Sequence, residues 1–138
     1  MGTYLSIVDV DHFKNYNDTL GHQEGDACLR TIAHALRAAM RRPGEILTRY
    51  GGEEFGAIAS DVKLQDAIQW GNRIQDKINE LALPHPASTT GGIVTVSIGI
   101  ASGVPTAELN AHHFVAVADK ALYTAKQSGR NRHIVMQV

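Results

Sequence analysis

The sequence predicts an α+β fold in which a single, mostly antiparallel five-stranded sheet is flanked by helices. Short β-branched runs alternate along the chain with longer stretches of helical periodicity. A Gly-Gly pair separates two short runs in the manner of a hairpin turn. In addition, 43% of the 138 residues are hydrophobic, which is enough to bury the core of one domain. The order of elements fits a ferredoxin-like or palm-type arrangement.

The N-terminal half is expected to contain a buried strand, two helical segments and a hairpin. Residues 3–10 are apolar and β-branched, as in a buried strand, and "HFKNYND" follows as a short helical segment. Apolar residues recur at helical spacing over residues 24–41, and "RRPGE" ends that helix because neither proline nor glycine continues it well. Residues 46–50 and 54–59 form the hairpin arms around Gly51-Gly52.

The C-terminal half is expected to contain helix, strand, helix and strand. Asp61 is predicted to cap the first helix, and "LPHPASTTGG" is the loop that ends it. One face of that helix is assigned to Leu64, Ile68, Gly71, Ile74, Ile78 and Leu81. Residues 93–102 alternate between larger apolar and smaller or polar side chains, which predicts a strand with one packed face. A helix over residues 112–127 and a strand over 132–138 follow.

Composition narrows the class of protein. The net charge is −1 and the pI is about 6.6, so no nucleic-acid partner is expected. The one cysteine, Cys28, falls in a helical pattern and is expected to be a small buried hydrophobe. No apolar stretch reaches membrane-spanning length and no signal peptide is visible, which predicts a cytoplasmic segment without membrane contact.

Carboxylates gather where the first strand and the hairpin end. Asp9 and Asp11 lie two residues apart at the end of the strand, so both side chains are expected on the same side. Glu53 and Glu54 follow the two glycines. Each pair also fits ordinary turn chemistry. If the first strand neighbours the hairpin, Asp9 and Glu53 meet, and their repulsion favours a bound cation. A site with oxygen ligands and without cysteine or clustered histidine favours Mg²⁺ or Mn²⁺. Mg²⁺ held by a few carboxylates usually binds phosphate groups of a substrate.

Two cations near the C-terminus support a phosphate site. Lys126 lies near the end of the predicted helix and Arg130 just beyond it. Such residues also complement a helix dipole without binding anything. "HFK" begins a helical turn directly after the first strand, where backbone N–H groups are free to bind an anion. Together the signals favour a metal–nucleotide site for phosphoryl transfer.

Four blocks, "DVDHFKNYNDTLGHQEGDACL", "RYGGEEF", "VSIGIA" and "ADKALYTAKQSGRNR", together resemble the GGDEF domain of diguanylate cyclases. They follow in order over nearly the whole chain, so residues 3–138 are expected to form one such domain. The resemblance implies an enzyme that joins two GTP molecules into cyclic di-GMP and releases two pyrophosphates. Because each domain offers one GTP, it also implies a homodimer with facing active sites.

The resemblance assigns roles to individual residues. Asp9, the carbonyl of Val10 and Glu53 match the positions that bind Mg²⁺, while Glu54 can reach a second metal and Glu53 is a proposed base for the ribose 3′-hydroxyl. The remaining matches are the phosphate-cradling amides of His12, Phe13 and Lys14, the phosphate-binding side chains of Lys126 and Arg130, and the guanine-binding pair Asn17 and Asp26. Alternatively, Asn17 is a turn former and Asp26 a helix N-terminal acid.

The sequence departs from the family pattern in three respects. The helix that normally precedes the first strand is missing from this sequence, so we expect an N-terminally truncated domain whose upstream sensor or regulatory domain is missing as well. The product-inhibition motif Arg-x-x-Asp is replaced by Arg42 to Glu45, while Arg73 matches a second arginine of that site. The alternative function is a catalytically weak or inactive module that binds GTP or cyclic di-GMP and signals through partners.

Overall fold

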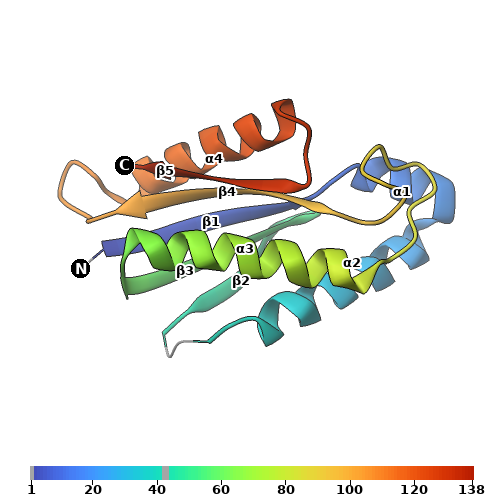
Figure 1. Ribbon diagram of the computed structural model, residues 1–138, viewed down its shortest axis with the longest axis horizontal. Coiled ribbons are helices and arrows are strands. Elements are labelled where there is room, and N and C mark those ends of the chain that lie inside the picture. The colour runs from blue at the N-terminus through green and yellow to red at the C-terminus, as the bar shows by residue number, and fades with distance from the viewer. Residues whose placement is uncertain (1, 42–43) are drawn as a thin grey trace.

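The computed structural model describes residues 2–41 and 44–138. In these residues one five-stranded sheet is flanked by four helices (Figure 1). The strands are β1 (Gly2–Val10), β2 (Ile46–Gly51), β3 (Glu54–Val62), β4 (Val96–Gly103) and β5 (Arg132–Gln137). The helices are α1 (Phe13–Leu20), α2 (His22–Ala38), α3 (Leu64–Leu81) and α4 (Ala111–Gln127). The predicted α+β class and the predicted order of elements are confirmed.

The strand order β2-β3-β1-β4-β5 places β1 in the centre, beside both the hairpin and β4. Every neighbouring pair is antiparallel except β4 and β5, which are parallel and joined through α4. The predicted mostly antiparallel sheet is therefore confirmed. None of the helices in the described ranges combines the length and apolar character needed to cross a bilayer.

The two faces of the sheet are covered by different helices (Figure 1). Helices α2 and α3 lie on one face, where Tyr4 and Val8 of β1 belong to the larger core. Helix α4 lies on the other face, and Ile7 of β1 packs there with Phe114 and Leu122. Because β4 is covered on both sides, its residues are buried in alternation toward each core. The prediction that this strand has only one packed face was wrong, since small side chains on its second face accommodate α4.

Two details of α3 also differ from expectation. Asp61 does not cap the helix, because it lies within β3, and the N-cap is Lys63, whose backbone N–H donates to Asp66 Oδ2 at 2.8 Å. The buried face of α3 includes Trp70, which the sequence analysis did not assign, whereas Leu64 is 40% exposed. Helix α2 covers residues 22–38 rather than 24–41.

Candidate active site

The hairpin of β2 and β3, which carries the GGEEF signature of residues 51–55, brings its carboxylates to the end of the central strand. Asp9 of β1 is the register partner of Glu54 of β3. One step along, the backbone N–H of Val10 donates to the carbonyl oxygen of Glu53 at 3.2 Å. The predicted juxtaposition of the first strand with the hairpin is therefore confirmed. Three acidic residues, Asp9 of β1, Glu54 of β3 and Glu53 of the turn before β3, lie at the same end of these strands, which we call the acidic edge.

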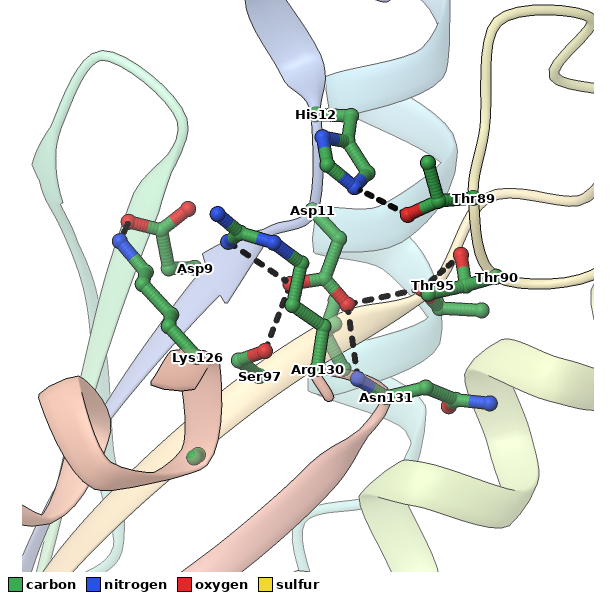
Figure 2. Close-up of polar contacts among 12 residues, drawn as sticks. Asp9, Asp11, His12, Thr89, Thr90, Thr95, Ser97, Lys126, Arg130 and Asn131 are labelled. Carbon is green, nitrogen blue, oxygen red and sulfur yellow. Dashed lines mark hydrogen bonds and ion pairs between the residues drawn. The ribbon is translucent and has the colours of Figure 1, made fainter. Parts of the chain in front are cut away.

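Lys126 partly neutralises this acidic edge. It lies in the last turn of α4, and its Nζ donates to Asp9 Oδ2 at 2.8 Å (Figure 2). Burial raises the pKa of Asp9; the hydrogen bond and charge of Lys126 oppose that shift, and the charges of Glu53 and Asp11 add to it. Burial also raises the pKa of Glu54, and the charge of Asp9 adds to that shift. The arrangement holds more negative than positive charge and can accept a further cation.

Asp11 has a different role from Asp9, because its carboxylate is saturated with donors. It is 1% exposed and accepts hydrogen bonds from Ser97 Oγ at 2.6 Å, Thr95 Oγ1 at 2.8 Å and the backbone N–H of Asn131 at 3.0 Å (Figure 2). A guanidinium nitrogen of Arg130 lies 4.0 Å away. Asp11 therefore joins the end of β1 to β4 and to the segment after α4, and has little capacity left to bind a ligand.

The turn after β1 forms the start of α1. His12 is the N-cap in a left-handed conformation with φ 54°, and no side chain caps the helix. The N–H groups of the first helical turn, including those of Phe13 and Lys14, have no carbonyl partner earlier in the same helix. Arg130 lies close enough that its charge, after burial, helps to lower the pKa of the His12 imidazole. Free N–H groups and positive charge thus meet at one turn, which suits an anion.

The donor atoms at the acidic edge suit a hard divalent cation. Carboxylates and a main-chain carbonyl are the ligands that Mg²⁺ and Mn²⁺ prefer. In residues 2–41 and 44–138, however, no three Asp, Glu, His or Cys side chains already converge as a ligand set. Lys126 stands beside Asp9 instead, in the position of a counter-ion. The residues present therefore fit such a cation once Lys126 is drawn away from Asp9.

A protein-family model described as "Diguanylate cyclase, GGDEF domain" matches residues 3–132. The chain belongs to the GGDEF domain family. The resemblance inferred from the four sequence blocks is confirmed, and so is the nucleotidyl cyclase fold.

Named relatives and solved structures agree with this assignment. The probable diguanylate cyclase DgcT of Escherichia coli K12 is 38% identical over 136 residues, which are 97% of this chain but 29% of DgcT. The crystal structure of Pseudomonas aeruginosa diguanylate cyclase SiaD, in complex with its activator SiaC, has a TM-score of 0.82 at 34% identity, covering 99% of this chain and 50% of that one. The GGDEF domain of Caulobacter crescentus DgcB, in complex with c-di-GMP, has a TM-score of 0.78 at 31% identity, covering 99% and 77%. This chain thus spans less than a third of DgcT.

The residues assigned to guanine lie on neighbouring helices of this GGDEF domain. Asn17 is on α1, and its Oδ1 is buried without a hydrogen-bond partner among the residues described. A Cβ on Gly25 of α2 would collide with that oxygen, so the glycine allows the amide to lie against α2. Asp26 is exposed and lines a cavity of about 380 Å³ between α2 and the hairpin, together with Leu29 and Phe55. Asp26 thus offers a carboxylate to this cavity, whereas Asn17 is not among the residues that line it.

The residues assigned to product inhibition fall at a separate, smaller cavity of about 140 Å³. Glu45 and Arg73 both line it, whereas Arg42 lies outside the described residues. Glu45 Oε2 already accepts from the backbone N–H of Arg41 at 2.9 Å. The Arg73 Nε donates to Ala39 O at 3.1 Å. Both side chains are thus held by this chain's own backbone at the rim of the cavity.

Sequence reasoning missed several residues that shape the site. His85, Thr89, Thr95 and Ser97 were not assigned, yet all contact the turn formed by Asp11 and His12. A signal for two of them was present, because the period of two that buries Val94 and Val96 places Thr95 and Ser97 together on the opposite side of the segment. For His85 and Thr89 no local signal existed, since the loop that carries them is irregular.

Proposed function

We propose that this GGDEF domain is a diguanylate cyclase catalytic domain that condenses two GTP molecules into cyclic di-GMP and releases two pyrophosphates. The observation that carries the proposal is the meeting of Asp9 with the signature glutamates beneath Lys126. Relatives named diguanylate cyclases and a related GGDEF domain solved with c-di-GMP support the same product.

Each part of the site has a chemical task in this proposal. Asp9, the carbonyl of Val10, Glu53 and Glu54 would hold Mg²⁺ or Mn²⁺, which neutralises phosphate charge when bound. The N–H groups of the first turn of α1 bind phosphate oxygens, and Lys126 and Arg130 bind the terminal phosphates. Glu53 accepts the proton of the ribose 3′-hydroxyl as that oxygen attacks the α-phosphate of the second GTP.

Specificity for guanine would come from Asn17 and Asp26. A carboxylate can accept hydrogen bonds from guanine N1–H and N2–H, which adenine does not offer. Because one domain binds one GTP, the reaction requires two copies of the domain that face each other about a two-fold axis. An upstream regulatory segment would then act by controlling that encounter.

The test is product formation by the purified domain at high concentration with GTP and MgCl₂. We expect cyclic di-GMP by chromatography, with ATP inert and with Asp9→Ala and Glu53→Ala inactive. Glu80→Ala, an exposed change on α3, is the matched control and should leave the rate unchanged. Absence of any cyclic dinucleotide, even when the domain is fused to a dimeric coiled coil, would contradict the proposal.

A second candidate is a binding module for cyclic di-GMP, and the cavity that contains Glu45 and Arg73 favours it. In this reading, product binds at that cavity and the signal passes to a partner. Calorimetry with cyclic di-GMP distinguishes the two functions: tight binding lost in Arg73→Ala, combined with zero turnover, supports the module alone.

A further inference from the structure

The loop between α3 and β4 packs against the turn that precedes α1, although the two are far apart in sequence (Figure 1). It is held in shape by its own backbone. The N–H of His85 donates to Gly92 O at 2.9 Å, and Pro84 forms an isolated bridge with Ile93. A braced loop of this kind can carry side chains to fixed positions.

His85 is buried at 1% exposure, and the one hydrogen bond that its side chain makes among the described residues is to the backbone of the turn. Its Nε2 lies 3.1 Å from the carbonyl oxygen of His12. Because a carbonyl oxygen can only accept, Nε2 must carry the proton and donate. The rings of Tyr16 and His85 pack in a T-shaped arrangement, with centroids 5.1 Å apart. The ring is therefore fixed by contacts from α1 itself.

The turn needs such support, because His12 has the backbone of a left-handed residue and lacks the usual helix cap. An ordinary N-cap is extended and offers a side-chain oxygen to the first turn, whereas His12 has φ 54° and offers none. Its carbonyl accepts both the first helical bond, from the Tyr16 N–H at 3.0 Å, and the bond from His85. A non-glycine residue stays in this conformation only where its surroundings hold it.

The same loop holds the turn at two further points (Figure 2). The His12 Nε2 lies 2.7 Å from Thr89 Oγ1, so the ring is held as well as the backbone. A chain of hydroxyl groups then leads from Thr90 Oγ1 to Thr95 Oγ1 at 2.8 Å, and from Thr95 to Asp11 Oδ2 at 2.8 Å. Three contacts from one loop thus converge on two adjacent residues of the turn.

We propose that His85, with the additional contact from Thr89, is a positioning residue for phosphate binding. By holding the carbonyl of His12, it fixes the left-handed turn and aims the N–H groups that begin α1 at the nucleotide phosphates. The proposal rests on the proposed function, because it requires that this turn bind GTP. His85 does not touch the substrate.

Two variants at His85 separate the hydrogen bond from the packing. His85→Phe keeps an aromatic ring against Tyr16 and removes the donor, while His85→Gln keeps an N–H group at a similar reach. With a non-hydrolysable GTP analogue and MgCl₂ in calorimetry, we expect His85→Phe to weaken binding about tenfold, as for the loss of one hydrogen bond to a strong acceptor. His85→Gln should recover most of that affinity.

Three further measurements exclude a purely structural explanation. The KM for GTP should rise in His85→Phe far more than kcat falls. The backbone amide resonances of Phe13 and Lys14 should shift in the nucleotide-free protein. Thr89→Val should weaken binding in the same direction by a smaller factor, whereas Thr106→Val, in the loop after β4, should not.

The outcomes separate this proposal from the proposed function. A wild-type domain that does not bind the GTP analogue overturns both. If wild type and folded His85→Phe bind the analogue with equal affinity, the role of His85 alone is overturned. The same holds if His85→Gln unfolds at the wild-type temperature but does not recover the affinity. Should His85→Phe not fold, Thr89→Val and His85→Gln decide the matter by the same criteria.

Discussion

Two glycines in one row of the sheet should differ strongly in their response to the same substitution. In that row Ile7 of β1 pairs with Gly56 of β3 on one side and with Gly99 of β4 on the other. Gly99 lies beneath α4, and a Cβ there would overlap the backbone of Ala118 and Leu122, reaching 2.8 Å from Leu122 Cα. A Cβ on Gly56 would meet the methyl group of Thr48 at 3.4 Å and the carbonyl oxygen of Ser6 at 3.9 Å, both ordinary contacts, beside a cavity of about 240 Å³.

The expected magnitudes follow from these contacts. Replacing a strand glycine by alanine stabilises a protein by about 0.4–1 kcal/mol through the unfolded chain when the new methyl group fits. Overpacking costs about 1–3 kcal/mol, and the upper part of that range applies to Gly99, because backbone atoms cannot rotate away from the methyl group. We therefore expect Gly99→Ala to lower the free energy of unfolding by about 2 kcal/mol and Gly56→Ala to change it by less than about 1 kcal/mol.

Urea denaturation followed by far-ultraviolet circular dichroism measures both values. With a slope of about 1–3 kcal/mol per molar urea, the midpoint of Gly99→Ala should fall by roughly 1 M. Helix α4 also carries Lys126, so its displacement should reduce the proposed cyclase activity in Gly99→Ala, whereas Gly56→Ala should leave that activity intact. The reasoning would be refuted if the two variants had equal urea midpoints, or if the midpoint of Gly56→Ala were lower than that of Gly99→Ala.

Three further perturbations concern buried polar groups. Asp11→Ala should lower the free energy of unfolding by about 3–5 kcal/mol in urea denaturation, because two hydroxyls and a backbone N–H lose a charged acceptor, while exposed Asp18→Ala should change it little. Burial raises the pKa of the Cys28 thiol to about 11, so iodoacetamide should alkylate the native protein far more slowly than the urea-unfolded protein at pH 8, and equal rates would contradict this. Burial lowers the pKa of His133, against the charge of Asp76, so the unfolded chain takes up a proton first and stability should fall as the pH drops below about 6.5. His133→Gln should show a smaller loss between pH 7 and 5.5 in urea denaturation, and an unchanged loss would rule His133 out.

Periodicity was sufficient to predict the elements, because each buries a stripe that local spacing reveals. Residues 3–10 and 46–50 were placed within a residue or so of the observed strands β1 and β2. The errors arose where tertiary contacts decide. Asp61 has the side chain of a cap, yet β3 continues through it. The second buried face of β4 depends on α4 packing across it, which no pattern within the strand could indicate.

The acidic edge could be predicted because Asp9 and the signature glutamates lie next to recognisable strand ends. What the sequence could not show is how those charges are balanced. The contact between Lys126 and Asp9 joins residues 117 positions apart. Similarly, His85 lies 73 positions from the turn it supports, within an irregular loop that offers no period from which to infer a direction.

The ion pair between Lys126 and Asp9 links the fold to the proposed chemistry. Asp9 is 6% exposed, and an isolated carboxylate at that depth would favour its protonated form, so Lys126 holds the site ready for a cation by keeping negative charge there. In the proposed function, a nucleotide bound with its own divalent ion would bring a new counter-ion for Asp9 and phosphate oxygens for Lys126. Asp9 would then be paired with the metal ion instead of Lys126, and Lys126 with phosphate instead of Asp9. Because the Asp9 carboxylate is already buried in the free protein, nucleotide binding adds little to its desolvation cost. Lys126→Met should for this reason weaken GTP binding and also raise the pKa of Asp9 further, which titration of the Asp9 carboxyl by NMR would detect. An unchanged Asp9 pKa in that variant would show that the ion pair does not prepare the site.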